Sequence, residues 1–312
     1  MNASTRATHR HSRFEHLALF HDGQDELIDL LAPRVTDAVH NGDAVLVCAS
    51  DALWSRLEST LGSTASELQF VPDDVRYAQP TVAMRMLHDF ARDRTAAGHG
   101  AVMSIGSIPF ADDPIANEDW IRYEAAIEEV LGHLPVQGLC TYDTVTTPSA
   151  LLDEARLTHP VAVDAAGRHD RASSCCPPRL PIQVPHEPPA VAAAVASARD
   201  ARDRITAAFE ASLDPTALDT LRVVASELVT NAATHGRAPV VLSAWRVPEQ
   251  DASLIDVSDG GPGIDDPFFE LRPPSGRPSG VGLWIVGQLA QRVTSARVGD
   301  EHHVTALVTH AV

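Results

Sequence analysis

The sequence predicts an α/β protein with two domains, and three features of the chain support this prediction. Its 312 residues favour two domains over one. In the first half, short apolar runs alternate with amphipathic segments, which is the pattern of a parallel sheet with crossover helices. In the last third, two helical segments come before the strands, which predicts an α/β sandwich with helices on one face of a mixed sheet.

The N-terminal domain is expected over residues 14–165. We expect its strands in four short apolar runs, namely Ala44–Cys48, Phe70–Val71, Ala101–Ile105 and Gly138–Tyr142. Apolar residues at helical spacing predict helices over Ala52–Leu61, Thr81–Thr95 and Glu118–Leu131. Asp51 precedes the first of these helices and can cap it.

A proline-rich linker is expected over residues 166–189. The stretch from Arg168 to Ala190 is crowded with Pro and Ser and has no apolar period, a composition that favours extended, semi-rigid chain. The adjacent Cys175 and Cys176 lack a second ligand pair, so we expect no structural zinc site there. Residues 1–13 are expected to be disordered.

The C-terminal domain is expected over residues 190–312. Its predicted helices are Val191–Ser212, Pro215–Thr234 and a segment from Gly282 to about Arg292. Its predicted strands are Val240–Val247, Ser253–Ser258, Ser295–Gly299 and Val304–Thr309. Asp214 can cap the second helix. One apolar stripe of that helix should face the sheet: Leu221, Val224, Leu228 and Ala232.

Composition excludes several classes of function. The net charge of −18 disfavours direct binding of nucleic acid, because such a chain cannot neutralise phosphates. All 24 basic residues are arginine, which excludes a P-loop because that motif needs lysine. No apolar run reaches the length of a membrane span, and no signal peptide precedes the first domain. We therefore expect a cytoplasmic protein without membrane contact.

Glu227 and Asn231 form the first candidate site. They are four residues apart, so they lie on one face of the predicted helix. The amide oxygen of Asn231 can ligate Mg²⁺ beside phosphates. Glu227 can accept a proton from an attacking hydroxyl. The alternative is a solvated polar pair.

Asp259 ends a predicted strand and begins the sequence Asp-Gly-Gly-Pro-Gly. Its carboxylate can accept a hydrogen bond from the exocyclic amine of adenine. Gly261 and Gly263 would let the backbone approach the base closely. The alternative is an ordinary Gly/Pro turn.

The segment from Ile264 to Ser279 suits a lid over the triphosphate, with Arg272 and Arg277 as its cations. Gly280 and Gly282 then start a helix, whose free N–H groups form an anion site. A plain helix start with tolerated glycines is the alternative.

Three segments, Glu227–Asn231, Asp259–Gly263 and Gly280–Gly282, together resemble the GHKL (Bergerat) family of ATP-binding domains, which includes gyrase and the histidine kinases. The resemblance implies that Glu227 is the catalytic base, that Asn231 holds Mg²⁺ and that Asp259 binds adenine. It also implies that ATP lies close to four glycines: Gly261, Gly263, Gly280 and Gly282.

The string from Ser226 to Gly236 most resembles the anti-sigma-factor branch of that family. Members of the branch are homodimeric serine/threonine kinases that bind a sigma factor and phosphorylate an antagonist protein. A histidine kinase is set aside because the preceding helix, Val191–Ser212, contains no histidine. His235 is expected at the pocket edge or as a helix cap.

The chain departs from this family near its last strand. Many relatives carry a Gly-Thr there, whereas this chain reads Gly299-Asp-Glu-His-His-Val-Thr305. Reduced ATP affinity or turnover is therefore an expectation. A non-catalytic, nucleotide-dependent module that sequesters a regulatory partner remains the alternative function.

The first domain resembles the MEDS sensory family over nearly its whole length. Six strings carry the resemblance: His16–Phe20, Asn41–Asp43, Gly106–Phe110, Glu118–Glu124, Gly138–Asp143 and Ala155–Pro160. The resemblance implies a RecA-like α/β fold that senses small organic molecules. A MEDS domain followed by this kinase type resembles RsbA-type anti-sigma regulators of actinobacteria.

Parallel sheets bind ligands at the carboxyl ends of their strands. We therefore expect the sensed ligand to contact polar residues of the first domain, namely His16, Glu124, Cys140, Asp143 and His159. The alternatives are that His159 caps a helix and that Cys140 is a core residue. A His/Cys metal site lacks the usual ligand spacing.

The sequence thus predicts a regulator that binds Mg-ATP and phosphorylates Ser or Thr of an anti-sigma antagonist under control of a sensory domain. Its expected partners are that antagonist, a sigma factor and a second copy of the chain.

Overall fold

The computed structural model describes residues 13–110, 113–170, 181–274 and 280–310. These residues fall into two compact units, which divide between residues 170 and 181. Among the described residues, the first unit contains a seven-stranded sheet and the second a five-stranded sheet. The α/β class predicted from the sequence is confirmed.

The first unit alternates strands and helices along the chain. Its strands are β1 (Glu15–His21), β2 (Ala44–Ala49), β3 (Gln69–Pro72), β4 (Val102–Gly106), β5 (Val136–Asp143), β6 (Val161–Asp164) and β7 (Gly167–Asp170). Its helices are α1 (Gln24–His40), α2 (Asp51–Leu61), η1 (Gly62–Glu67), α3 (Asp73–Arg76), α4 (Pro80–Ala96), α5 (Pro114–Leu131) and α6 (Ser149–Thr158). The strand order is β3-β2-β4-β5-β1-β6-β7, and every neighbouring pair is parallel except β6 with β7.

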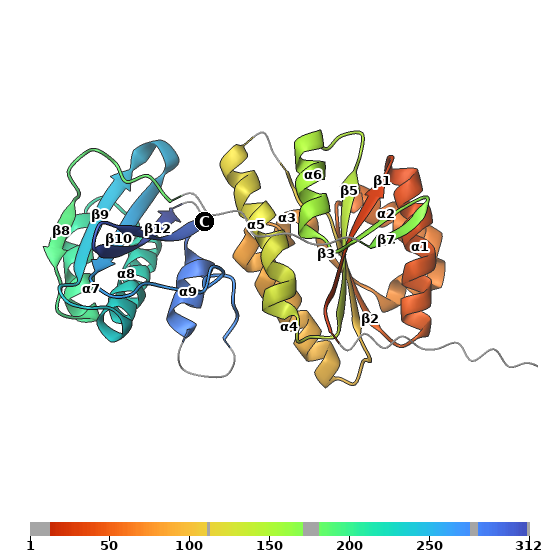
Figure 1. The fold of residues 1–312 in the computed structure, drawn as a ribbon, viewed down its shortest axis with the longest axis horizontal. Coiled ribbons are helices and arrows are strands. Elements are labelled where there is room, and N and C mark those ends of the chain that lie inside the picture. Colours follow the sequence, from red (N-terminus) through yellow and green to blue (C-terminus); the bar gives the residue numbers. More distant parts are fainter. Residues whose placement is uncertain (1–12, 111–112, 171–180, 275–279, 311–312) are drawn as a thin grey trace, which may run out of the picture. The chain divides into compact units, whose positions relative to one another are not determined.

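Helices cover both faces of this sheet. Figure 1 shows α1 and α2 on one face and α4, α5 and α6 on the other. Successive side chains of a strand point to opposite faces. Leu17 and Leu19 of β1 therefore join the core under α1 and α2, whereas Ala18 and Phe20 join the core under α6. The even-numbered residues of β1 thus face α5 and α6.

Three expectations for the first unit need correction. The strand β1 was not predicted, although its apolar centre is fully buried. Strand β7 lies within the segment predicted as linker, because residues Gly167–Asp170 pair antiparallel with β6. The cap of α2 is Ser50, whose hydroxyl accepts the N–H of Leu53 at 3.3 Å, so Asp51 is instead the first helical residue.

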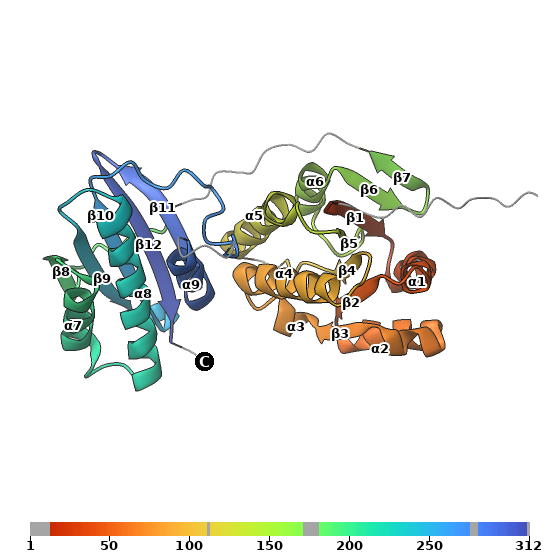
Figure 2. The ribbon, with the colours of Figure 1, turned by 90° about the horizontal axis from the view of Figure 1, so that it is seen from below.

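The second unit is an α/β sandwich. Its strands are β8 (Val191–Ala194), β9 (Val241–Val247), β10 (Ala252–Asp259), β11 (Arg292–Val298) and β12 (Glu301–Thr309), and its helices are α7 (Ala198–Phe209), α8 (Pro215–His235), η2 (Pro248–Gln250) and α9 (Val281–Leu289). The strand order is β11-β12-β10-β9-β8. Figure 2 shows α7, α8 and α9 on the same side of this sheet. All described strand pairs are antiparallel, so the expected mixed sheet is wrong.

The first predicted helix of this unit was too long. Residues Val191–Ala194 form an edge strand that pairs with β9, and α7 begins at Ala198 after the cap Ser197. Alanine favours helix, but pairing along a free sheet edge outweighs that weak preference. The last helix ends at Leu289, because Arg292 already belongs to β11.

Two expectations for α8 are confirmed. The carboxylate of Asp214 accepts the N–H groups of Thr216 and Ala217 at 2.9 and 3.0 Å, so it caps the helix. The predicted apolar stripe is buried in the core between the helices and the sheet: Leu221, Val224, Leu228 and Ala232. The cap and the stripe together fix where α8 starts and which face it turns to solvent.

Candidate functional site

Helix α8 presents Glu227 and Asn231 beside the start of α9. Both side chains are half-buried, and neither makes a hydrogen bond or ion pair with another described residue. Their four-residue spacing places them on one face of α8, next to the buried stripe. A carboxylate and an amide held side by side without intramolecular partners are available to an external ligand.

Gly282 lies directly against Glu227. A Cβ atom on Gly282 would stand 2.5 Å from Oε2 of Glu227, so only glycine fits there without movement. Gly280 caps α9 with a φ of 94°, a left-handed conformation that favours glycine. The free N–H groups at the start of α9 therefore lie next to the Glu227 carboxylate, which is the arrangement that an anionic phosphate beside a catalytic base requires.

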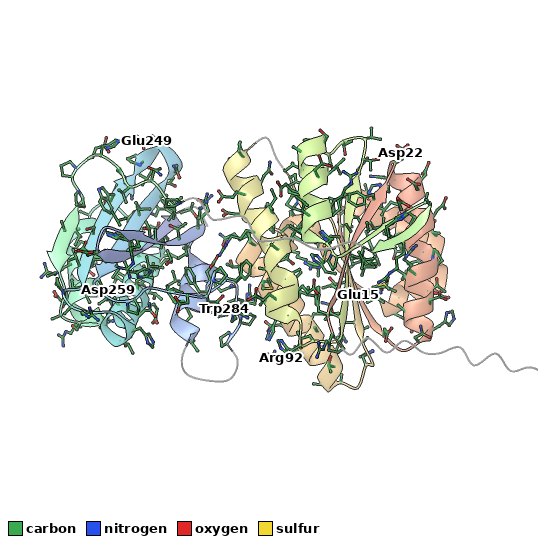
Figure 3. The ribbon with its side chains drawn as sticks, in the orientation of Figure 1. Glu15, Asp22, Arg92, Glu249, Asp259 and Trp284 are labelled. Carbon is green, nitrogen blue, oxygen red and sulfur yellow. The ribbon has the colours of Figure 1, made fainter. Side chains whose placement is uncertain are left out.

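Asp259 is buried at the end of β10, and Figure 3 labels it. Its Oδ1 accepts the N–H of Gly261 at 2.6 Å and the N–H of Arg237 at 3.1 Å. Gly236 and Gly261 both crowd this carboxylate, and a Cβ on Gly261 would stand 2.6 Å from Oδ1. The backbone thus holds one oxygen of Asp259, which leaves Oδ2 to accept a further donor.

His302 is a titratable neighbour of that second oxygen. It lies opposite Asp259 on β12, with Nδ1 3.9 Å from Oδ2 of Asp259 and Nε2 2.8 Å from the hydroxyl of Ser295. A Cβ on Gly263 would touch its ring at 2.9 Å. Burial lowers the pKa of His302 and so favours its neutral imidazole.

Thr305 lies away from this carboxylate. Its hydroxyl donates to Oδ1 of Asp256 at 2.8 Å, three residues before Asp259 along β10. His302, not Thr305, lies opposite Asp259 on the neighbouring strand β12. This neighbour of Asp259 was not predicted from the sequence. Gly236 and Arg237 were also missed as neighbours of Asp259, although the Gly that follows α8 is a visible helix-end signal.

The remaining predicted residues of this site are less tightly grouped. Arg272 is half-buried, and its Nε donates to Oδ2 of Asp266 at 2.6 Å, an ion pair within the segment predicted as a lid. His235 is the last residue of α8 and is exposed. Arg277 lies outside the described residues, as do Cys175 and Cys176.

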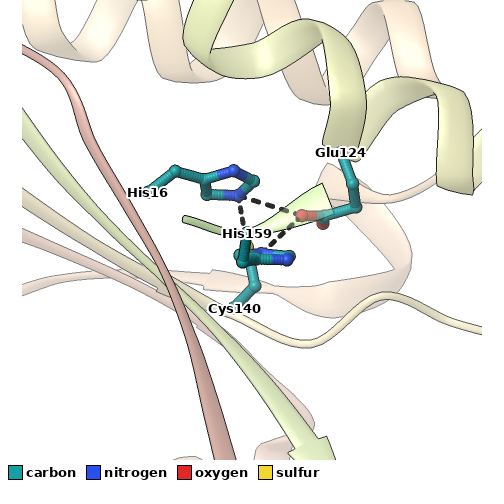
Figure 4. A group of neighbouring side chains, drawn as sticks. All are labelled: His16, Glu124, Cys140 and His159. Carbon is teal, nitrogen blue, oxygen red and sulfur yellow. Dashed lines mark hydrogen bonds and ion pairs between the residues drawn. The ribbon is translucent and has the colours of Figure 1, made fainter. Parts of the chain in front are cut away.

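The first unit contains a second candidate site. Four side chains from separate parts of the chain converge beneath α5 and α6, and Figure 4 shows them pointing toward one another. They are His16 of β1, Glu124 of α5, Cys140 of β5 and His159, the residue after α6. Their exposed fractions are 0, 2, 8 and 0%. One potential ligand atom from each lies within 4.8 Å of the others.

Strand register and helix period explain this convergence. His16 and Cys140 are even-numbered residues of adjacent parallel strands, where Ala18 lies opposite Cys140, so both face α5 and α6. Glu124 lies on the inner face of α5, beside the buried Tyr123. His159 follows the last turn of α6, and its Nδ1 lies 2.8 Å from the carbonyl oxygen of Ala155.

The electrostatics of this cluster are unusual. Burial lowers the pKa of His16 to about 4, so its imidazole is neutral at pH 7. Burial alone would raise the pKa of Glu124, but His159 and His16 hold it well below its usual range, so Glu124 is ionised. Burial raises the pKa of the Cys140 thiol. An ionised carboxylate is therefore held in the interior of the unit, almost wholly buried.

Asp143 lies apart from the other four predicted ligand residues. It ends β5, and its Oδ1 accepts the N–H of Val145 at 2.9 Å in the following turn. A surface pocket of about 420 Å³ opens near this edge, lined among others by His21, Thr144 and Asp164. These residues lie at the ends of β1, β5 and β6, where parallel sheets bind ligands. The pocket and the buried cluster are separate places.

Two family models match the chain. Residues 15–160 match the MEDS domain, described as the methanogen/methylotroph, DcmR sensory domain. Residues 191–308 match the histidine kinase-like ATPase domain. No curated protein matches the chain. The first unit is therefore a MEDS domain and the second a histidine kinase-like ATPase domain.

Among the helices described, none is long and apolar enough to cross a membrane.

Proposed function

We propose that this chain is a serine/threonine protein kinase of the anti-sigma type, with its ATPase domain under the control of its MEDS domain. The contact between Glu227 and Gly282 carries the proposal, because it places a carboxylate without an intramolecular partner at the N-terminus of α9. There the carboxylate would lie beside the terminal phosphate of a nucleotide bound by α9.

Each described residue of the site would have one role in a kinase. The Oδ2 atom of Asp259 would accept the amine of adenine, while Gly280 and Gly282 leave room for the phosphates. The amide oxygen of Asn231 would hold the Mg²⁺ that accompanies ATP. Mg²⁺ would neutralise charge on the phosphates.

Glu227 would accept the proton of a Ser or Thr hydroxyl. The hydroxyl oxygen then forms a bond to the γ-phosphorus, the bond from that phosphorus to the β,γ-bridging oxygen breaks, and ADP leaves. The string from Ser226 to Gly236 favours a Ser/Thr acceptor, because it resembles the anti-sigma branch. An antagonist protein would be the acceptor, a sigma factor the sequestered partner, and a homodimer the working unit.

A nucleotide-dependent binding module without phosphate transfer is the second candidate. One observation favours it: the Gly-Thr that many relatives carry near the last strand is missing, and Thr305 of β12 donates to Asp256 instead. In that case ATP would set the shape of the domain, and the surface alone would trap the partner.

Phosphate transfer from labelled ATP to a candidate antagonist protein separates the two functions. We expect the full chain to transfer label and Glu227→Gln to lose at least roughly 100-fold in rate while still binding ADP. Glu249→Gln is the matched control, because Glu249 is exposed in η2. Binding of nucleotide without transfer by the unmodified chain would support the module, and unchanged transfer by Glu227→Gln would contradict the assignment of the base.

A further inference from the structure

We propose that His16, Glu124, Cys140 and His159 form a closed, four-coordinate zinc site inside the MEDS domain. The proposal concerns the first unit alone and does not depend on the kinase activity. The candidate ligand atoms are Nε2 of each histidine, Oε2 of Glu124 and Sγ of Cys140.

The hydrogen bond of His159 sets the direction of its second nitrogen. Its Nδ1 lies 2.8 Å from the carbonyl oxygen of Ala155, which can only accept, so Nδ1 carries the proton. The other ring nitrogen, Nε2, lies 2.9 Å from Oε2 of Glu124, so these two atoms are placed to bind one ion together. Histidines that bind metals commonly donate their other N–H to a backbone carbonyl in this way.

His16 contacts the same carboxylate, although its Nδ1 has no hydrogen-bond partner among the described residues. Its Nε2 lies 3.0 Å from Oε2 of Glu124 and 3.3 Å from Sγ of Cys140. Neither carboxylate oxygen of Glu124 receives a backbone N–H or hydroxyl donor from the part of the chain that the structure describes. The polar groups around this carboxylate are two imidazoles and a thiol, each of which can bind a metal ion through nitrogen or sulfur.

The distances between the ligand atoms are close to, and slightly shorter than, those around a tetrahedral zinc ion. Zinc bonds of about 2.0–2.3 Å separate neighbouring ligand atoms by about 3.3–3.8 Å. The three contacts above are 2.9, 3.0 and 3.3 Å, and all four ligand atoms lie within 4.8 Å of one another. Small outward shifts of the side chains would open the centre to an ion.

The charges also balance. Glu124 supplies one negative charge, and binding of Zn²⁺ to Cys140 forms a zinc–sulfur bond and releases the thiol proton to water. With two neutral histidines the site then has no net charge, which matters because its members are almost wholly buried. Nitrogen, sulfur and oxygen ligands in a closed set are typical of structural zinc. The ion would tie α5 and the end of α6 to the sheet.

Replacement of zinc by cobalt tests the site in the full chain. We expect about one Co²⁺ per chain, with the strong visible bands of tetrahedral Co²⁺ and a near-ultraviolet thiolate-to-cobalt band. Cys140→Ser should abolish the thiolate band and weaken Zn²⁺ binding at least roughly 100-fold. Cys48→Ser is the matched control, because Cys48 is the other described free cysteine and is also buried.

Two further variants separate this site from others. Replacement of both Cys175 and Cys176 by serine should leave the thiolate band unchanged. Glu124→Gln, which keeps the size of the side chain, should weaken the visible bands even if Cys140→Ser fails to fold. A chain that binds no Co²⁺ or Zn²⁺ would overturn the proposal, and so would a thiolate band that Cys140→Ser retains or that disappears in the Cys175/Cys176 variant.

Discussion

Two adjacent glycines after β10 have very different surroundings. A Cβ on Gly261 would stand 2.6 Å from Oδ1 of Asp259, whereas a Cβ on Gly260 would stand 3.6 Å from its nearest neighbour, the carbonyl oxygen of Arg237. At the residue scale, the position of the Asp259 carboxylate therefore depends on the absence of one side chain.

Alanine at these two positions tests that dependence. Gly261→Ala should displace Asp259 and weaken ADP binding roughly tenfold or more, the cost of one hydrogen bond to a charged group. Gly260→Ala should bind ADP with unchanged affinity, since its Cβ makes an ordinary contact. Calorimetric titration with ADP and Mg²⁺ measures both, and equal affinities in the two variants would contradict the proposed role of Asp259.

His302 predicts a pH dependence. Burial holds its pKa below 6.5, and among the described groups Asp259, Arg297 and His303 act on its charge. As the pH falls through this lowered pKa, an imidazolium forms 3.9 Å from Oδ2 of Asp259 and competes with the adenine amine. We expect ADP affinity to fall below pH 6.5. His302→Thr should remove this dependence and His235→Thr should retain it. An affinity that falls with pH equally in the unmodified chain and in His302→Thr would contradict the prediction.

At the scale of elements, the Asp214 cap and the buried stripe of α8 determine where Glu227 points. Asp214→Ala removes the acceptor for two backbone N–H groups and should destabilise the second unit by about 1 kcal/mol. Asp219→Ala, on the exposed face of the same helix, removes only an ion pair with Arg222 and should cost under about 0.5 kcal/mol. Urea unfolding compares the two free energies, and equal losses would argue against the cap.

Sequence patterns predicted a helix or strand well when the residues that determine it lie within that element. The period of α8 and the cap at Asp214 are visible in the sequence, because both depend on residues a few positions apart. Val191–Ala194 was predicted as helix because alanine favours helix, but its partner β9 lies about fifty residues away. Edge pairing of this kind cannot be read from a local window.

The candidate sites show the same difference between local signals and contacts made by residues far apart in the sequence. The spacing of Glu227 and Asn231 made their position on one face of α8 predictable. His302 and Arg237 meet Asp259 only through the sheet register and the end of α8, so no spacing reveals them. The buried cluster of the first unit takes its four members from separate parts of the chain, and therefore lacks the short ligand spacing by which zinc sites are recognised in sequences.

At the scale of the whole molecule, the two units have separate cores. The core of the second unit consists of residues from Val191 to Val308. A fragment of residues 178–312 should therefore fold alone and bind ADP with the affinity of the full chain. Titration of both with ADP measures this. A fragment that is unfolded, or that binds differently, would show that the MEDS domain contributes to the nucleotide site.

Calorimetric titration of the full chain with ADP and Mg²⁺ tests the nucleotide site most directly, because it needs no protein partner. The unmodified chain and Glu227→Gln should each bind one ADP. Asp259→Asn should not bind ADP, because the side-chain NH₂ that it introduces cannot accept a hydrogen bond from the adenine amine. An unmodified chain that does not bind ADP, or an Asp259→Asn variant that binds it as tightly as the unmodified chain, would contradict the site.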